Sequence, residues 1–446
     1  ITSPVTKWNY QITDASEIPA VLAKAFYIAK SGRPGPVLID ITKNAQLQLF
    51  DYKGYEKCEF IRSYKPQPDI RISYIEQAAE LINQAKKPFV IFGQGVILGN
   101  AEQEFLEFIE KSGIPSAWTI MGMSAIPTNH PLAVGMLGMH GNYAPNLFTN
   151  ECDVLIAIGM RFDDRVTGRL DKYAKQAQII HLDIDPAEID KNVQVTVPVW
   201  GNCKETLPLL TERVQQKSHH EWISKFHKAI EIESEKLITP ELFPQNGEIT
   251  MGEVIQLINE LTNGEAVMVT DVGQHQMVTC RYSHQNKTRS NITSGGLGTM
   301  GFALPAAIGA KYGAPERTVI AVMGDGGAQM NIQELGTIMQ FKPNVKILIL
   351  NNSFLGMVRQ WQELFHEKRY SFTDIQSPDF VQVAKGYGIK GNKVAVREEL
   401  KSTLEEMLHH PESYLLEVAV RMEDNVFPMV PQGKGVSEIV LCKEDI

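Results

Sequence analysis

Short apolar runs recur along this chain, and they constrain its fold more than any other feature of the sequence. The strands that they predict are 37–41, 88–92, 153–158, 178–183, 267–270, 318–322 and 345–350. Apolar runs of roughly four to eight residues bounded by turn residues are typical of strands buried on both faces. Helical segments separate most of these runs, and this alternation favours parallel sheets flanked by helices. The sequence therefore predicts an α/β fold.

The chain divides into segments of different character, because its 446 residues exceed what one ordinary core holds. In residues 1–50 the sequence predicts one helix and one strand. These two elements cannot close a hydrophobic core, so we expect them to be the remnant of a domain whose earlier part precedes Ile1. The other segments are a linker at 51–70, an α/β unit at 71–205, a charged helical connector at 206–250, an α/β unit at 251–420 and a surface tail at 421–446. We thus predict one partial and two complete α/β domains.

Charge and cysteine usage exclude several classes of function. The formal net charge is −9, and no long block of Lys or Arg occurs, so nucleic-acid or anionic-membrane binding is not expected. No apolar run reaches the ~20 residues that span a bilayer. Five cysteines without a C-x-x-C pair favour a reduced, intracellular protein over a disulfide framework or a zinc site. We expect a cytoplasmic protein, or a plastid protein if a transit peptide precedes Ile1.

Two neighbouring predicted strands end in residues that suit a metal and a diphosphate. The strand at 318–322 leads into Met323-Gly324-Asp325-Gly326-Gly327, and the strand at 345–350 ends in Asn351-Asn352. Ligands bind beyond the carboxyl ends of parallel strands, so Asp325 and Asn352 should converge. With a main-chain carbonyl near Phe354 they offer Mg²⁺ three oxygens and leave room for phosphate oxygens. The glycines allow close backbone approach, and the next helix N-terminus favours an anion.

Gly-Asp-Gly alone is more often a tight turn than a cofactor site. The second strand ending in Asn-Asn, 27 residues after Asp325, reverses that balance. Together the two features resemble the thiamin diphosphate signature.

The resemblance extends over residues 1 to about 430 and is specific. The stretches that carry it are SGRPGPVLIDITK, MHGNYAPNLFTNECDVLIAIGMRFDDRVTGRL, TDVGQHQM with SGGLGTMGFALPAA, and GDGGAQMNIQEL followed by ILNNSFLGMVRQWQ. They resemble the catalytic large subunit of the acetohydroxyacid synthase (acetolactate synthase) family. The resemblance implies the thiamin-diphosphate-enzyme fold, with thiamin diphosphate, Mg²⁺ and FAD as cofactors. It also implies decarboxylation of pyruvate and condensation with a second 2-keto acid, in branched-chain amino acid biosynthesis.

The resemblance assigns roles to residues of the last α/β unit, which it implies is the diphosphate- and Mg²⁺-binding domain. Expected thiamin diphosphate contacts are Gln274, His275, Gly298, Met300, Gly324, Asp325, Gly326, Gly327, Asn352, Phe354, Gly356 and Met357; the metal ligands are Asp325, Asn352 and Phe354. Met300 should hold the cofactor in a bent form. Trp361, one helical turn after Met357, should line the substrate channel and favour 2-ketobutyrate.

The central unit is expected to bind FAD, and residues 1–50 to be the remnant of the pyrimidine-binding domain. Expected flavin contacts are Arg33, Gly93, Gly95, Thr119, Ile120, Met121, Met139, His140, Gly159, Arg161, Asp163, Arg165, Asp183 and Ile184. Because the reaction has no net redox change, the flavin would be structural. Lys43 and Arg165 should line the substrate channel, where Arg165 would hold the carboxylate of the second keto acid.

The family's catalytic glutamate and a Phe-Gln pair would precede Ile1, so we expect this chain by itself to be inactive. The resemblance further implies a homodimer or homotetramer with active sites between subunits, and a small regulatory subunit.

Single motifs leave other interpretations open. Met300 alone fits a core methionine, Trp361 alone a core or interface tryptophan, and residues 161–169 a solvated charged loop. Rival enzymes are pyruvate oxidase, glyoxylate carboligase and the flavin-free catabolic acetolactate synthase. A non-catalytic flavin-binding module is the rival of another class, and it leaves Asp325 and Asn352 unexplained.

Overall fold

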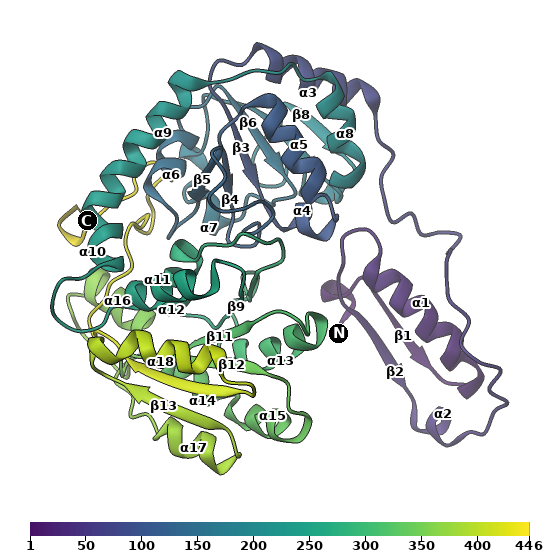
Figure 1. The fold of residues 1–446 in the computed structure, drawn as a ribbon. Helices are drawn as coiled ribbons and strands as arrows, with labels where there is room; N and C mark the ends of the chain where they lie inside the picture. The colour runs from purple at the N-terminus through teal and green to yellow at the C-terminus, as the bar shows by residue number, and fades with distance from the viewer. Residues whose placement is uncertain (446) are drawn as a thin grey trace.

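The computed structural model describes residues 1–445 and contains two six-stranded parallel sheets and a small two-stranded unit. The predicted α/β fold with parallel sheets flanked by helices is confirmed. Figure 1 shows the two large sheets stacked one above the other, while the N-terminal unit lies to one side at the end of a long extended segment.

The N-terminal unit pairs β1 (Trp8–Ile12) with β2 (Val37–Ile41) in parallel, and α1 (Ile18–Lys30) connects them. Asp14 accepts a hydrogen bond from the Ser16 backbone N–H and so caps the short turn before α1. Strand β1 was not predicted, because its sequence WNYQI is polar and only Ile12 is fully buried. The short helix α2 (Lys43–Leu47) follows β2.

The central domain has the strand order β5-β4-β3-β6-β7-β8. Its elements are α3 (Ile72–Gln84), β3 (Pro88–Phe92), α4 (Gln94–Leu98), α5 (Glu102–Ser112), β4 (Ser116–Trp118), β5 (Ala133–Met136), α6 (Tyr143–Thr149), β6 (Val154–Ile158), α7 (Asp164–Thr167), β7 (Gln178–Asp183) and β8 (Val197–Trp200). The chain moves outward from β3 through β4 to β5 and then returns to β6 on the other side of β3. The carboxyl ends of β3 and β6 therefore form a topological switch point. Helix α3 begins at Ile72, after Arg71, whose side chain makes no capping hydrogen bond.

The charged segment at 206–250 is mostly helical and packs on the central domain. Helix α8 (Cys203–Arg213) contacts α3 and α5, and α9 (His220–Glu233) contacts α6. Trp222 and Phe226 are buried beside Phe148 in the central core. Beyond α9, a π-helical turn (Ser234–Ile238) and α10 (Thr239–Leu242) lead into the last domain. The charged residues thus form the outer face of helices whose inner face is apolar.

The last domain has the strand order β10-β9-β11-β12-β14-β13, with its switch point between β9 and β11. Its elements are α11 (Met251–Thr262), β9 (Val267–Thr270), α12 (Gln274–Tyr282), β10 (Asn291–Thr293), α13 (Ala303–Gly313), β11 (Val319–Gly324), α14 (Asp325–Met330), α15 (Leu335–Phe341), β12 (Val345–Asn351), α16 (Gly356–Phe365), α17 (Phe380–Gly386), β13 (Lys390–Val394), α18 (Arg397–His409) and β14 (Tyr414–Ala419). Helix α14 begins directly after β11, and a 3₁₀ turn (Ile332–Glu334) separates it from α15.

Residues 421–445 do not lie wholly over the surface as predicted, because part of the segment is packed into the interior. Val426, Met429, Val430 and Val436 are buried. The Val430 N–H donates to the Met139 carbonyl of the central domain, and Gly435 forms an isolated bridge with Gly168. The prolines and glycines that suggested a surface tail here allow an irregular path between two domains.

Within residues 1–445, no helix combines the length and the apolar character that crossing a bilayer requires.

Candidate functional site

The loops at the two switch points border two adjoining pockets that share lining residues, and the two together are called the cavity. Its larger part has a volume of about 820 Å³ and is lined by residues of both large domains and by Arg33 of the N-terminal unit. A smaller pocket of about 60 Å³ at the ends of β11 and β12 shares Val272, Gly273, Met300, Met357 and Val358 with it. Parallel strands of both sheets thus aim their carboxyl ends at one site, as expected for ligand binding in open α/β sheets.

The smaller pocket contains the predicted metal ligands. Asp325 follows β11, is 1% exposed, and its Oδ2 accepts a hydrogen bond of 3.0 Å from Ser377 Oγ. Burial raises the pKa of the Asp325 carboxyl to about 6. Asn352 follows β12 and is 4% exposed, and its Oδ1 accepts from the Phe354 N–H at 3.2 Å. A buried carboxylate without a cationic side chain beside it is a donor set that fits Mg²⁺. Among the described residues, no group of three or more His, Cys, Asp or Glu is placed to hold a metal ion.

The rest of this pocket fits a diphosphate. His275 is buried, its Nε2 has no hydrogen-bond partner within residues 1–445, and burial lowers its pKa, so the ring is neutral and can donate one N–H. A Cβ at Gly324 would lie 2.9 Å from His275 Nδ1, which explains why a glycine stands there. The backbone of residues 324–327 enters α14 at the pocket wall, where main-chain N–H groups favour an anion.

Apolar side chains line the junction between the smaller pocket and the larger part of the cavity. Met300 and Met357 border both, and Trp361 lines the larger part, with its ring 4.9 Å from that of Phe365. The loop that carries Met300 is held by Asp271, whose carboxylate accepts from the Gly301 and Ala303 N–H groups at 2.9 and 3.0 Å. The position of Met300 is therefore fixed by backbone hydrogen bonds to the end of β9.

The larger part of the cavity begins where the turns after β3 and β6 touch. A Cβ at Gly95 would lie 2.5 Å from Gly159 Cα, and a Cβ at Gly93 would lie 2.5 Å from the Gly159 carbonyl oxygen. The Gly95 N–H donates to that carbonyl at 2.9 Å. Two loops can approach this closely only as glycines, and they leave an open cradle whose volume suits a dinucleotide.

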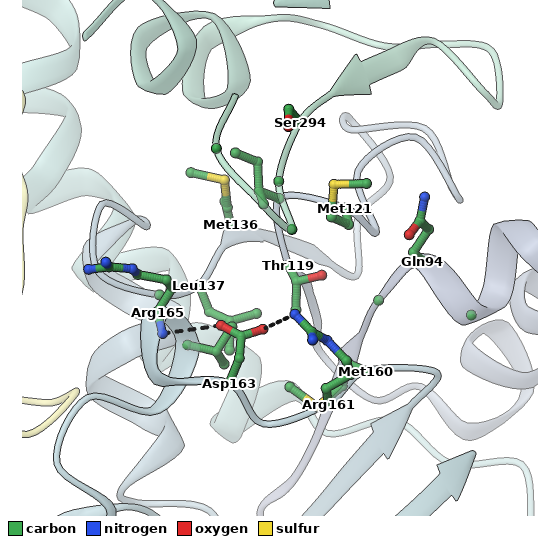
Figure 2. Close-up of a pocket in the computed structure, with 18 of the residues that line it drawn as sticks. Gln94, Thr119, Met121, Met136, Leu137, Met160, Arg161, Asp163, Arg165 and Ser294 are labelled. Carbon is green, nitrogen blue, oxygen red and sulfur yellow. Dashed lines mark hydrogen bonds and ion pairs between the residues drawn. The ribbon is translucent and has the colours of Figure 1, made fainter. Parts of the chain in front are cut away.

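Charged side chains stand around this cradle (Figure 2). Arg161 lies 3.5 Å from Asp163, and the Arg165 backbone N–H donates to the Asp163 carboxylate at 3.1 Å. Asp183 ends β7, and burial raises its pKa to about 6. An acidic group in this place suits a ribose hydroxyl. His140 Nδ1 is buried and has no partner within the described residues, which leaves it available to a ligand. These groups fit FAD.

The structure brings nearly all of the predicted site residues together. The larger part of the cavity contains Arg33, Gly93, Gly95, Thr119, Ile120, Met121, Met139, His140, Gly159, Arg161, Asp163, Arg165, Asp183, Ile184, Gly298, Met300, Met357 and Trp361. The smaller pocket contains Gln274, His275, Gly324, Asp325, Gly326, Gly327, Asn352, Phe354 and Gly356. Arg33 is ion-paired with Asp185 and Glu188, so in this chain its guanidinium faces the protein. Lys43 lies outside both, exposed at the start of α2.

Sequence reasoning missed three polar residues that organise the site. Asp271 directly follows strand β9, in the same position relative to its strand as Asp325 has relative to β11. Gln360 and Ser377 hydrogen-bond to site residues from positions that no spacing rule connects to them.

Comparison with known proteins gives the same picture. Residues 75–210 match the thiamine pyrophosphate enzyme central domain, and residues 271–418 match the thiamine pyrophosphate enzyme C-terminal TPP binding domain. The acetolactate synthase large subunit of Buchnera aphidicola subsp. Schizaphis graminum is 40% identical over the whole chain, which covers 79% of that relative. The acetolactate synthase isozyme 3 large subunit of Escherichia coli is 39% identical, with the same coverage. A probable acetolactate synthase large subunit of Methanocaldococcus jannaschii is 40% identical over 98% of the chain and 75% of its own length.

These matches confirm the resemblance that the motifs indicated, and they favour acetolactate synthase over the rival thiamin enzymes and the non-catalytic module. Thiamin diphosphate follows from the matched domains, and Mg²⁺ and FAD are typical of the family. The chain belongs to the acetolactate synthase large-subunit family of thiamin-diphosphate enzymes.

Proposed function

We propose that this chain contributes to the decarboxylation of pyruvate and to the condensation of the remaining two-carbon unit with pyruvate or 2-ketobutyrate, the first common step of branched-chain amino acid biosynthesis. The observation that carries the proposal is the convergence of Asp325 and Asn352, from adjacent strands, on a pocket that opens beside Met300. The names of the relatives, as acetolactate synthase large subunits, support the choice of reaction.

Mg²⁺ and the diphosphate occupy the smaller pocket in this proposal. The Asp325 carboxylate, Asn352 Oδ1 and the Phe354 main-chain carbonyl hold the metal. His275 Nε2 and the N–H groups at Gly326 and Gly327 take phosphate oxygens. Both Asp325 and Asn352 are buried, so their interaction with the metal is only weakly screened by water.

When bound, thiamin diphosphate supplies the carbon nucleophile and accepts the electron pair that decarboxylation releases. The chain's own residues orient the substrates and exclude water. Met300 and Met357 confine the cofactor ring between the two parts of the cavity, and Trp361 borders the space for the second keto acid. Arg165 binds the carboxylate of that keto acid; its side chain is 69% exposed and lies 3.7 Å from Met139 Sδ, at the open side of the cavity.

FAD occupies the larger part of the cavity and serves as a structural group, since the reaction needs no electron acceptor. Glycines 93, 95 and 159 form its cradle, and Asp183 faces the ribose. Arg161, Asp163 and His140 supply polar contacts.

Other subunits complete this assembly. Lys43 lies outside the cavity of its own chain, and we therefore assign it to an active site formed between two copies in a homodimer or homotetramer. A small regulatory subunit is the further partner, because the relatives are named large subunits.

A product assay on the full natural protein tests the function. With FAD, Mg²⁺ and thiamin diphosphate, pyruvate should give 2-acetolactate, and added 2-ketobutyrate should give 2-aceto-2-hydroxybutyrate, while the flavin absorbance stays that of the oxidised form. Stoichiometric reduction of the flavin by pyruvate without a C–C bond-forming product would overturn the proposal in favour of an oxidase.

A further inference from the structure

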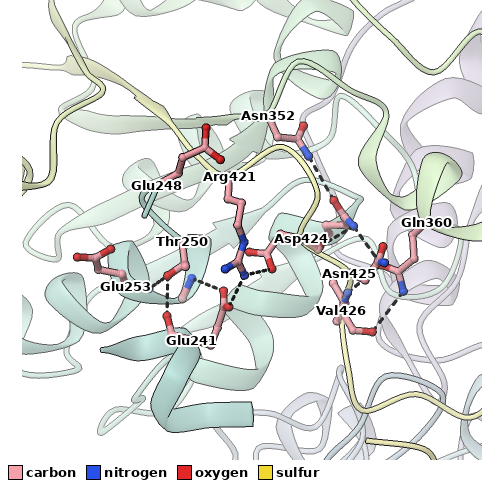
Figure 3. Close-up of polar contacts among 12 residues, drawn as sticks. Glu241, Glu248, Thr250, Glu253, Asn352, Gln360, Arg421, Asp424, Asn425 and Val426 are labelled. Atoms are coloured by element: carbon pink, nitrogen blue, oxygen red, sulfur yellow. Dashed lines mark hydrogen bonds and ion pairs between the residues drawn. The ribbon is translucent and has the colours of Figure 1, made fainter. Parts of the chain in front are cut away.

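A row of buried side-chain amides connects the metal pocket to the C-terminal segment (Figure 3). It runs from Asn352 through Gln274 to Gln360 and ends on the backbone of residues 424–426. We propose that Gln274 and Gln360 are positioning residues that hold the Asn352 amide with its oxygen toward the metal. The inference rests on the proposed function, because Asn352 must be a metal ligand for its orientation to matter.

The orientation of the Gln360 side-chain amide is set by the backbone N–H and carbonyl of Val426. Gln360 is 1% exposed on α16; its Oε1 accepts from the Val426 N–H at 2.8 Å, and its Nε2 donates to the Val426 carbonyl at 3.2 Å. A backbone N–H can only donate, and a backbone carbonyl can only accept. Turning the amide over would place two donors together and two acceptors together, so the Gln360 oxygen must face the Val426 N–H.

The same logic then fixes Gln274. Its Nε2 donates to Gln360 Oε1 at 3.0 Å and to the Asp424 carbonyl at 2.8 Å, and both of those atoms are acceptors. Both hydrogens of the Gln274 amide are therefore used inside the protein. Its Oε1 points the other way, toward Asn352. The side chain has no hydrogen left for a phosphate oxygen, so we replace its expected role as a cofactor contact by a positioning role.

Asn352 is the last member of the row. Its Nδ2 donates to Gln274 Oε1 at 3.3 Å, which turns its Oδ1 to the opposite side, where it accepts from the Phe354 N–H at 3.2 Å. The second lone pair of Oδ1 remains for a cation. The reversed amide would present NH₂ to Mg²⁺ and could not bind it.

Packing supports the row at both ends. A Cβ at Gly356 would lie 2.0 Å from Gln274 Oε1 and 2.8 Å from Asn352 Nδ2, so only glycine leaves room for this contact. At the other end, Asp424 is held by Arg421, whose backbone N–H donates to the Ile249 carbonyl at 2.8 Å. The backbone of the C-terminal segment thus determines, through Gln360 and Gln274, which way the Asn352 side-chain oxygen points.

The test is the Mg²⁺ affinity of the full protein at saturating thiamin diphosphate, followed by tryptophan fluorescence. Gln360→Met keeps a side chain of similar size but removes the Oε1 acceptor and the Nε2 donor. We expect Mg²⁺ binding to weaken by roughly 10- to 100-fold, which is the range seen when outer hydrogen-bond partners of metal ligands are lost. FAD affinity should not change. Gln360→Glu keeps oxygens for the Val426 and Gln274 donors but sets its second oxygen against the Val426 carbonyl, so it should restore only part of the affinity.

A matched control separates positioning from simple loss of stability. Asn259 is 6% exposed in the same domain, and its amide also bonds two backbone groups, the Tyr282 carbonyl at 2.8 Å and the His284 N–H at 2.9 Å. Asn259→Leu should lower the melting temperature about as much as Gln360→Met and leave Mg²⁺ affinity unchanged.

A double-mutant cycle with Asn352→Asp gives the sharpest readout. A carboxylate presents oxygen in either orientation, so Gln360→Met should cause no further loss of Mg²⁺ affinity in that background. An equal loss in both backgrounds, or unchanged Mg²⁺ binding by Gln360→Met, would overturn the positioning role. If Asn352→Ala itself binds Mg²⁺ as tightly as the parent, the metal assignment in the proposed function fails as well, and the two failures are thereby distinguished.

Discussion

The two parts of the cavity sit at equivalent topological switch points, yet they are built from different chemistry. In the central domain, the turns after β3 and β6 meet glycine against glycine, and the surrounding charges are partly exposed: the Arg161 side chain is 46% exposed and Arg165 69%. In the last domain, Asp325, Asn352, Gln274 and His275 are all 5% exposed or less. One part of the cavity is thus defined mainly by its shape, and the other mainly by buried polar groups.

This difference follows from what each ligand needs. A flavin nucleotide offers a large surface, so a cradle with open backbone can bind it mainly by shape, with Asp183 as the buried acidic group. A diphosphate and a divalent cation carry concentrated charge, which requires oriented buried partners to replace their water. Substitutions at the two sites should therefore have separable effects.

The largest effect is expected for Asp325→Ala. Removing the buried carboxylate takes away the only anionic side chain assigned to the metal, so Mg²⁺-dependent thiamin diphosphate binding should fall by roughly 100-fold or more. FAD content should stay that of the parent protein. Calorimetric titration with each cofactor measures both. Asp379→Ala is the control, because that exposed carboxylate only caps α17; equal loss of thiamin diphosphate binding in both variants would contradict the assignment.

Gly95→Ala is the converse substitution. Its Cβ would meet the backbone of Gly159 at 2.5 Å, so the turn after β3 must move away from β6 and the cradle deforms. We expect FAD affinity to fall by roughly 10-fold or more, from the usual cost of overpacking, with Mg²⁺ and thiamin diphosphate affinity unchanged. Flavin fluorescence after gel filtration measures retention. Gly309→Ala on α13, where a Cβ meets nothing within 4 Å, should retain all cofactors; FAD loss there would show that the effect is unspecific.

Much of the fold and of the two cofactor sites could be predicted from the sequence, because the strands and the site motifs depend on local patterns. The strand at 178–183 was predicted with its exact bounds, and Asp325 and Asn352 were paired because parallel strands end at one edge. Strand β1 was missed since its sequence is polar, and the segment after residue 420 was misplaced because turn-rich sequence does not reveal what covers it.

Local patterns do not predict the order of the strands in each sheet. They also do not predict the hydrogen-bond partners that orient the side chains of the site. Gln360 reaches Val426 across 66 positions, and Ser377 reaches Asp325 across 52. Such contacts arise from tertiary packing, and nothing in the residues around Gln360 marks it as different from Gln362 two positions later.

A smaller effect is expected where the two parts of the cavity meet. Trp361→Leu enlarges the space beside Met300 and Met357. It changes neither the residues assigned to Mg²⁺ and the diphosphate nor the glycines that form the flavin cradle. If Trp361 favours the larger second substrate, the preference for 2-ketobutyrate over pyruvate should drop by roughly 10-fold, the scale of discrimination by one apolar contact. A competition assay that measures the two products gives this ratio. Phe365→Leu, which removes only the ring that packs on Trp361, should change the ratio less; an unchanged ratio in Trp361→Leu would exclude the tryptophan as selector.

The smallest effect concerns Glu241, which lies where the connector, the last domain and the C-terminal segment meet. Its carboxyl shares Arg421 with Asp424, and Tyr282 is nearby; burial, and then the Asp424 carboxylate, raise the pKa of Glu241 to about 8. The folded protein therefore keeps a proton that the unfolded chain releases, so this contribution to stability is full below about pH 4.5 and is lost as pH rises toward 8. Glu241→Gln stays neutral, and its melting temperature relative to the parent should rise by roughly 2–4 °C between pH 5 and pH 8. Glu248→Gln, at an exposed position, should show no such trend in thermal unfolding. The same pH trend in the melting temperature of both variants would exclude Glu241 as its cause. A change in the affinity of Glu241→Gln for FAD or for thiamin diphosphate would show that this junction between the domains is coupled to the cofactor sites.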